Sequence, residues 1–242
     1  MTRPLPQGDK ANESGKVVVV IPALNEEQSI GVVLDEVKEA LQSYPLGMVV
    51  VDGQNGSTDR TAYIASSRGA HVIRQPGMGY GDALQSGFQY ACDELGAQII
   101  VMMDADATYR GEDLAKMVNQ IVMMDADLVI GNRFADLKKG SMTMINRIGN
   151  RILSLLAKKC LSVEVSDTQC GLRVLRADSW RRLDIRETGM AFAIEMIAQA
   201  EKAGCRILEV PIGYYPRIGV SKLSPFRDGF RILVTILRLS RR

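Results

Sequence analysis

Residues 17–27 read VVVVIPALNEE, an apolar run that ends in a proline and continues into polar residues. An unbroken run of β-branched residues is typical of a strand covered on both faces. Similar short runs predict strands over Val17–Ile21, Met48–Val51, His71–Ile73, Gln98–Met103 and Asp127–Ile130. Segments with helical periodicity lie between them and predict helices over Gln28–Gln42, Asp59–Ser67, Tyr80–Leu95 and Gly111–Met123. This alternation indicates an α/β fold, with a mostly parallel central sheet flanked by helices.

The composition excludes several classes of protein. With 30 basic and 28 acidic residues among 242, the net charge of +2 is too balanced for a general nucleic-acid binder. The four cysteines are far apart and His71 is the single histidine, so a structural zinc site is not expected. Because no apolar run approaches the roughly 18 residues of a spanning helix, we expect no transmembrane segment.

The chain divides into three predicted parts. Residues 1–15 are polar and lack an apolar period, which indicates a disordered leader. Residues 16–224 are long enough for one large domain. Residues 225–242 predict a basic amphipathic helix opened by Pro225, with apolar residues sharing one side: Phe226, Phe230, Leu233, Ile236 and Leu237. Leu137–Leu161 is a second basic amphipathic stretch. Both are interpreted as segments that lie on a membrane surface, or alternatively as core-packing helices with solvated basic faces.

Polar residues follow three of the predicted strands. Asn25 and Glu26 follow the first, Asp52 ends the second, and Asp104 and Asp106 follow the fourth. Open α/β sheets bind ligands in the crevice beyond the carboxyl ends of their strands. We therefore expect these side chains to face one crevice.

The strand over Gln98–Met103 delivers two carboxylates, Asp104 and Asp106, at its exposed end. Such hard oxygen ligands suit Mg²⁺ or Mn²⁺, and a cation of this kind bridges carboxylates to substrate phosphates. Two alternatives remain: the aspartates only cap a turn, or residues 104–108, DADAT, form the D-x-D-x-T motif of a phosphatase with an aspartate nucleophile. The phosphatase motif normally follows the first strand of its fold, and here it follows the fourth.

Ordered motifs along the chain resemble those of family 2 glycosyltransferases with the GT-A fold. Residues 21–27, IPALNEE, are similar to the family's I-P-x-x-N-E-E, and residues 50–59, VVDGQNGSTD, to its V-V-D-D-G-S-x-D. Asp104-Ala105-Asp106 matches its D-A-D. Further matches, which extend to about Leu223, are most similar to the polyprenyl-phosphate hexose synthases: residues 131–133, GNR; 167–171, DTQCG; Phe192 with Glu195; and 217–222, RIGVSK.

The resemblance implies a role for each matching residue. Pro22, Leu24 and Glu26 would contact the nucleoside, and Asp52 the base or ribose. Asp104 and Asp106 would hold the metal and the diphosphate, and Ala105 would help to bind the nucleotide sugar. Arg217 and Lys222 would clamp the diphosphate from a mobile loop. The expected catalytic residues are Asp106 and Arg133.

The acceptor would be a lipid phosphate. Arg133 is the leading predicted ligand for it, followed by Asn146 and Arg147. A phosphate monoester is largely dianionic at neutral pH, so it needs cations to offset repulsion rather than a strong base. Asp167 would orient one of these groups or the sugar hydroxyls, or would cap a helix or turn. Glu195 would recognise the sugar or form a buried ion pair.

The expected function is metal-dependent, inverting transfer of a hexose from GDP-mannose, UDP-glucose or UDP-N-acetylglucosamine to a polyprenyl or dolichyl phosphate. The expected location is the cytoplasmic face of a membrane, as a peripheral protein with a membrane protein as an additional partner. A soluble or polysaccharide acceptor and a non-catalytic nucleotide-sugar-binding subunit are the alternatives. Leu24 and Gly53 depart from the family's common Tyr and Asp, which leaves the base open. A nicotinamide enzyme is disfavoured, because residues 77–81, GMGYG, have the wrong spacing.

Overall fold

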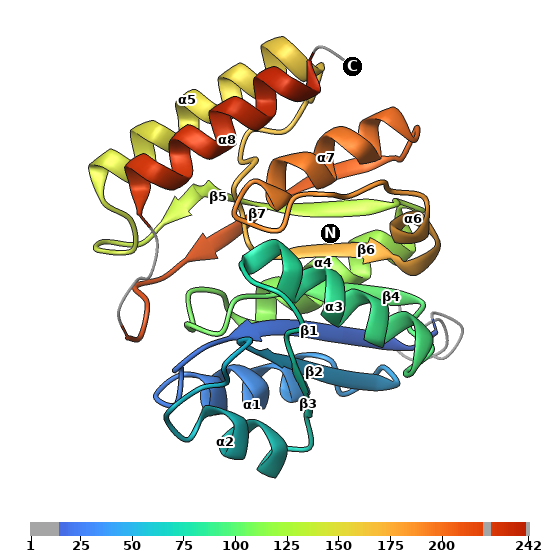
Figure 1. Ribbon diagram of the computed structural model, residues 1–242. Coiled ribbons are helices and arrows are strands. Elements are labelled where there is room, and N and C mark those ends of the chain that lie inside the picture. The colour runs from blue at the N-terminus through green and yellow to red at the C-terminus, as the bar shows by residue number, and fades with distance from the viewer. Residues whose placement is uncertain (1–14, 220–223, 241–242) are drawn as a thin grey trace, which may run out of the picture.

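The computed structural model describes residues 15–219 and 224–240, which form an α/β domain (Figure 1). Its centre is a seven-stranded sheet in the order β3-β2-β1-β4-β6-β5-β7. The strands are β1 (Val17–Ala23), β2 (Leu46–Asp52), β3 (His71–Arg74), β4 (Ile99–Met102), β5 (Leu128–Leu137), β6 (Arg173–Arg176) and β7 (Ile207–Tyr214). Only β6 runs antiparallel to its neighbours within this sheet. The predicted α/β fold with a mostly parallel sheet is confirmed.

The helices pack in connected groups. They are α1 (Ile30–Ala40), α2 (Thr61–Ser67), α3 (Tyr80–Asp93), α4 (Gly111–Met123), α5 (Met144–Leu161), α6 (Ala177–Arg181), α7 (Phe192–Lys202) and α8 (Pro225–Leu239). α1 packs against α2 and α4, α3 packs against α7, and α8 packs against both α7 and α5. α5 and α8 lie side by side at the top of Figure 1, far from α2 at the bottom.

The predicted elements exist with small shifts at their ends. Residues 17–21 of β1 are fully buried, as expected for a strand covered on both faces. The helix predicted over Gly111–Met123 matches α4, whose buried residues recur at helical spacing: Leu114, Met117, Val118 and Ile121. β5 reaches Leu137 rather than ending at Ile130. The predicted leader falls almost wholly outside the described residues.

The prediction that the apolar residues of the C-terminal helix share one side holds for Phe226, Phe230 and Leu237 but not for Ile236. Ile236 is fully buried, and with Ile232 it packs into a small core that includes Leu153 of α5 and Ile194 of α7. Other apolar residues of α8 form a separate exposed stripe, which comprises Phe226, Phe230, Val234 and Leu237. α5 has a similar exposed stripe: Met144, Ile145, Ile148, Ile152 and Leu155. Each helix therefore has both a buried and an exposed apolar side.

The sheet topology places the carboxylates at a switch point. β1 lies between β2 and β4, to which it is parallel on both sides. α1 follows β1 on its way to β2, whereas the chain returns to the other side of β1 through α3 and β4. The strand order thus reverses between β1 and β4, and open α/β sheets bind ligands at the carboxyl ends of the strands beside such a switch point.

Candidate active site

The loops after β1 and β2 are joined by hydrogen bonds. The backbone N–H of Asn25 donates to Ser57 Oγ over 2.9 Å, and Asn25 Oδ1 accepts from the Thr58 N–H over 2.7 Å. Asn25 has a φ of 52°, which Asn tolerates better than most residues. The two loops therefore form one rigid wall beside the predicted nucleoside residues Pro22, Leu24 and Glu26.

Asp52 holds the loop after β2 with one carboxylate oxygen, and its other oxygen lies near the Arg74 guanidinium. Its Oδ1 accepts from the Ser57 N–H at 2.8 Å and from Ser57 Oγ at 2.7 Å. Its Oδ2 lies 3.9 Å from Arg74 Nη2, and the Asp52 side chain is almost wholly buried. One oxygen of Asp52, which is predicted to contact the nucleoside, is thus used to hold its own loop. Arg74 is a further residue of the site that the sequence motifs did not indicate.

Leu24 and Glu26 lie on the first of these loops. A Cβ at position 53 would lie 3.0 Å from Leu24 Cδ1, so Gly53 leaves room for the half-exposed Leu24 side chain. The Glu26 N–H donates to Thr61 Oγ1 over 2.7 Å, while Ser29 Oγ donates to Glu26 Oε2 over 3.4 Å. Lys222, the other predicted diphosphate ligand besides Arg217, lies outside the described residues.

Asp106 is fixed by a tight turn and faces an arginine. Its Oδ1 accepts from Thr108 Oγ1 at 2.7 Å and from the Thr108 N–H at 3.2 Å. Ala107 between them has a φ of 61°, an unusual value for a residue with a side chain, and strained residues of this kind cluster at functional sites. Asp106 Oδ2 lies 3.4 Å from Arg217 Nη2. Asp106 and Arg217, both predicted to bind the diphosphate or its metal, therefore lie close together.

Arg217 belongs to a loop that is hydrogen-bonded to the turn that contains Asp106. The Ile218 N–H donates to the Asp106 carbonyl over 3.0 Å, and the Tyr215 N–H donates to the Thr108 carbonyl over 3.0 Å. Nε of Arg217 is buried and has no hydrogen-bond partner among the residues that the structure describes. A buried donor of this kind has an unmet requirement for an acceptor.

Asp104 is the carboxylate of the pair that is bonded to a tyrosine. Tyr80 Oη donates to Asp104 Oδ1 over 2.6 Å. Burial, followed by repulsion from Asp106, raises the pKa of Asp104 from 3.8 to about 6. The hydrogen bond from Tyr80 and the charges of Arg133 and Arg217 oppose this rise. Two carboxylates that resist simultaneous ionisation favour a bound cation.

Arg133 and Asp167 form a buried bidentate ion pair. Arg133 Nε lies 2.7 Å from Asp167 Oδ2, and Nη2 lies 2.8 Å from Oδ1. Asp167 is fully buried and Arg133 is 6% exposed, and the guanidinium carbon lies 5.1 Å from the centre of the Tyr214 ring. The register between β5 and β7 shifts between Asn132 and Asp136, beside Arg133. Asp167 therefore orients Arg133, and its Oδ1 also accepts from the Gln169 N–H of its own turn at 3.4 Å, so two of its predicted roles are present.

Asn146 and Arg147 lie in the first turn of α5, which Thr143 caps by accepting the Asn146 N–H at 3.2 Å. Their side chains make no hydrogen bond or ion pair with Arg133, or with any other residue in the described ranges. The structure thus does not join the three predicted acceptor ligands into one bonded cluster. They stay predictions.

Glu195 forms a buried ion pair, which is the structural one of its two predicted roles. Its Oε2 accepts from the Arg186 N–H at 2.8 Å and from the Glu187 N–H at 2.6 Å. Oε1 lies 3.7 Å from Arg238 Nη2 of α8, and the Glu195 side chain is almost fully buried. The carboxylate therefore anchors the loop before α7 rather than pointing an unpaired oxygen to a sugar.

The family model described as Glycosyl transferase family 2 matches residues 18–183. The chain belongs to this family of glycosyltransferases. It is 40% identical to the low-salt glycan biosynthesis hexosyltransferase Agl6 of Haloferax volcanii over 88% of its own length, but it spans only 51% of that relative. It is 35% identical to a dolichyl-phosphate hexose transferase of the same organism, over 92% of this chain and 93% of the relative.

Solved structures show the same fold as this glycosyltransferase. The glucosyl-3-phosphoglycerate synthase of Mycobacterium tuberculosis, in complex with Mn²⁺, UDP and glucosyl-3-phosphoglycerate, matches with a TM-score of 0.76. The match covers 99% of this chain and 86% of the other, with 20% sequence identity. The GT-A fold expected from the motifs is thereby confirmed.

The carboxylate pair of the glycosyltransferase fits a cation that a substrate helps to hold. Within the described ranges, no three or more His, Cys, Asp or Glu side chains converge as a metal cluster. Two carboxylates are nevertheless what a protein commonly supplies to Mg²⁺, with substrate phosphates and water completing its shell. Asp104 and Asp106 are therefore chemically suited to Mg²⁺ or Mn²⁺ bound together with a diphosphate.

Of the residues around Asp104 in the glycosyltransferase, the sequence motifs contain Gly171 but not Tyr80 or Tyr109 as site residues. A Cβ at position 171 would lie 2.1 Å from Asp104 Oδ2, which explains a glycine there. The Gly171 N–H donates to Tyr109 Oη over 2.8 Å. Tyr80 lies within the GMGYG stretch, which was weighed only as a dinucleotide fingerprint. The feature of the sequence that could have indicated Tyr80 was its place at the start of a predicted helix that follows a predicted strand.

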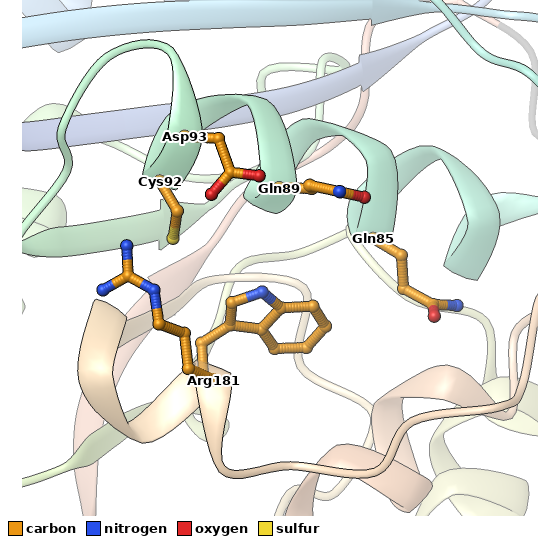
Figure 2. A pocket seen from close by; sticks show the side chains of 6 residues that line it. Gln85, Gln89, Cys92, Asp93 and Arg181 are labelled. Carbon is orange, nitrogen blue, oxygen red and sulfur yellow. The ribbon is translucent and has the colours of Figure 1, made fainter.

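A separate hollow of the glycosyltransferase lies between α3 and α6 (Figure 2). Its lining consists of Gln85, Gln89, Cys92, Asp93, Trp180 and Arg181. None of these residues belongs to the predicted site. The hollow therefore adds nothing to the carboxylate site described above.

Proposed function

We propose that this glycosyltransferase transfers a hexose from a nucleotide diphosphate sugar to a polyprenyl phosphate at a membrane surface, assisted by Mg²⁺ or Mn²⁺. The observation that carries the proposal is the Asp104–Asp106 pair beside Arg217, at the switch point of the sheet. This arrangement combines anionic metal ligands with a cation that has an unfilled buried donor at Nε. Both features match a bound diphosphate.

The proposed donor site runs from the loops after β1 and β2 to the end of β4. Pro22, Leu24 and Glu26 would contact the nucleoside, and the second oxygen of Asp52 would accept a hydrogen bond from the base or ribose. Arg217, with Lys222, would bind the diphosphate. Ala105 between the two carboxylates is buried, so this position would contribute backbone atoms.

The proposed reaction is a single displacement. An oxygen of the acceptor phosphate forms a bond to the anomeric carbon, while the bond between that carbon and the nucleoside diphosphate breaks and the diphosphate leaves with the electron pair. Asp104 and Asp106 would hold a divalent cation, whose chemistry is to neutralise the charge of the leaving diphosphate. Attack opposite the leaving group inverts the anomeric centre. The acceptor dianion needs no general base.

Arg133 would contribute to the acceptor end of the site. Asp167 accepts hydrogen bonds from the Nε–H and from one Nη2–H of Arg133. Because a guanidinium has five N–H donors, other N–H groups of Arg133 stay available for a phosphate. The buried Asp167 fixes the plane of the guanidinium, and such preorganisation makes the cation more effective. Asn146 and Arg147 would extend this acceptor region.

The lipid character of the acceptor is supported by the surface of α5 and α8. No helix in the described ranges is long and apolar enough to cross a membrane. The exposed apolar stripes of these helices carry basic neighbours instead: Arg151, Lys158, Lys159, Arg227, Arg231 and Arg238. Helices of this kind lie in the interface of anionic membranes. The name of the related dolichyl-phosphate hexose transferase agrees with such an acceptor.

The test is product formation by the purified chain. GDP-mannose, UDP-glucose and UDP-N-acetylglucosamine would be supplied in parallel with Mn²⁺ or Mg²⁺. Each would be tested with a short polyprenyl phosphate, with the matching unphosphorylated polyprenol and with a water-soluble phosphate monoester. We expect lipid-extractable sugar from one donor, only with the phosphate, and none in EDTA. Product on a water-soluble phosphate instead would favour a soluble acceptor. Nucleotide-sugar binding without turnover would favour a non-catalytic subunit.

A further inference from the structure

The side chain of Asp104 is held from two sides by residues to which no role has been given. Its Oδ1 accepts from Tyr80 Oη at 2.6 Å, within the short range typical of a hydroxyl that donates to a carboxylate. Its Oδ2 lies on the side of Gly171, where a Cβ would approach to 2.1 Å. Within the described ranges, Oδ2 accepts no hydrogen bond. The rotation of the carboxylate is therefore fixed, with one oxygen used and one spare.

Tyr80 is itself fixed at the first position of α3. Gly79, which precedes it, has a φ of 100°, and a Cβ there would lie 2.4 Å from the Thr188 carbonyl oxygen. The Asp82 N–H donates to the same carbonyl over 3.0 Å. Gln75 Nε2 donates to the Gly79 carbonyl over 2.7 Å. The helix start is thus bound to the loop before α7 and to the loop after β3, which leaves the tyrosine ring little freedom.

That loop before α7 is anchored in turn. Glu187 Oε1 accepts from Thr235 Oγ1 at 3.0 Å and from Arg238 Nη2 at 2.6 Å, both of α8. The Glu187 N–H donates to Glu195 Oε2 over 2.6 Å. Tyr80 therefore projects from a well-braced support, as a residue that orients a ligand requires.

We propose that Tyr80 is a positioning residue that orients Asp104 for binding of the divalent cation. This inference rests on the proposed metal site. Partners that hydrogen-bond to a metal ligand fix its orientation, and removing one typically weakens metal affinity by about 10- to 100-fold. The tyrosine hydroxyl occupies one oxygen of Asp104 and leaves Oδ2 for the cation. Tyr80 does not touch the reacting atoms in this role.

The test is a Mn²⁺ titration of Tyr80→Phe in the presence of UDP and, in parallel, of GDP, with free Mn²⁺ measured by electron paramagnetic resonance. Tyr44→Phe is the matched control, because Tyr44 Oη also donates over 2.6 Å, but to Asn119 on α4. We expect about tenfold weaker Mn²⁺ binding for Tyr80→Phe and no change beyond about twofold for Tyr44→Phe. A merely structural role would lower the melting temperature and leave the Mn²⁺ affinity of the folded protein unchanged.

A second variant guards against loss of folding. Gly171→Ala places a methyl group against Asp104 from the opposite side, and we expect it to weaken Mn²⁺ binding as well. If the parent binds Mn²⁺ and folded Tyr80→Phe binds it equally well, the positioning role is overturned and the metal site stands. If Tyr80→Phe does not fold, equal Mn²⁺ binding by the parent and Gly171→Ala leads to the same conclusion. If the parent binds no Mn²⁺ with either nucleotide, the proposed metal site is overturned, and the role of Tyr80 with it.

Discussion

Asp104 is the residue whose ionisation most affects the proposed chemistry. Burial and the neighbouring Asp106 raise its pKa to about 6, so the protonated form persists to higher pH than for an ordinary aspartate. A protonated carboxyl is a poor cation ligand, because protons compete with the metal. The site therefore gains its metal affinity as pH rises through about 6, and loses it as pH falls.

We predict that Mn²⁺ affinity is nearly constant above about pH 7 and declines by up to about tenfold for each pH unit below about 6. The measurement is titration with Mn²⁺ alone, since a terminal phosphate of a nucleotide titrates in the same range. Circular dichroism at each pH checks that the chain stays folded. An affinity that does not change between about pH 5 and about pH 8 would contradict the raised pKa.

At the scale of residues, the sequence predicts the two carboxylates but not what surrounds them. Asp104 and Asp106 follow an apolar strand, so their position at its carboxyl end could be inferred from local pattern. Tyr80 lies 24 residues before Asp104, and their contact depends on how α3 packs after β3. Asp167 lies 34 residues after Arg133, and its bidentate pairing requires the folded sheet. Contacts of this kind are tertiary and leave little local signal.

At the scale of elements, α8 is tied to the loop before α7 by Arg238 and Thr235. Arg238 Nη2 lies 2.6 Å from Glu187 Oε1 and 3.7 Å from Glu195 Oε1. Glu195 is 1% exposed, and an uncompensated buried carboxylate is costly. Because the Arg238 side chain is itself 45% exposed, solvent screens part of the interaction.

We predict that Arg238→Met lowers the free energy of unfolding by about 1–3 kcal/mol, as measured by urea denaturation. Arg181→Met is the matched control, because Arg181 pairs with Asp178 at 3.1 Å where both side chains are exposed. The control should change stability by less than about 0.5 kcal/mol. Equal losses in the two variants would show that the buried carboxylate does not depend on Arg238.

The elements differ in how far their sequences predicted them. α4 and β1 have long, regular apolar patterns, and both were found near their predicted ends. β6 has only four residues, RVLR, and its terminal arginines give no alternation to read. Its Arg173 is fully buried, because three backbone carbonyls accept from its guanidinium: those of Thr168, Cys170 and Ala193. Tertiary hydrogen bonds, not hydrophobic pattern, place this strand.

At the scale of the whole molecule, the paired helices α5 and α8 give the glycosyltransferase one distinctive surface. Phe226 and Phe230 are 80% and 66% exposed on α8. The opposite side of the same helix packs Ile232 and Ile236 into a core. Deletion of the helix would therefore remove both surface and core, whereas substitution of the exposed phenylalanines isolates the surface.

We predict that Phe226→Ser with Phe230→Ser weakens binding to vesicles that contain anionic lipid by at least about tenfold, because each buried phenylalanine contributes about 1.5–3 kcal/mol. Donor binding should stay unchanged. Tyr63→Ser is the control, since Tyr63 is 64% exposed on α2, at the far end of the molecule (Figure 1). Unaltered vesicle binding by the double variant would remove the membrane role of α8.

The most direct test of the proposed transferase site is turnover by Asp106→Ala beside the parent chain, with the active donor, a short polyprenyl phosphate and Mn²⁺. Asp106 faces Arg217 over 3.4 Å and is largely held by Thr108 of its own turn, so its removal should leave the fold intact. We predict an unchanged melting temperature and loss of lipid-extractable sugar at every Mn²⁺ concentration. Parent-like product formation by Asp106→Ala would contradict the assignment of the carboxylate pair to metal-assisted transfer.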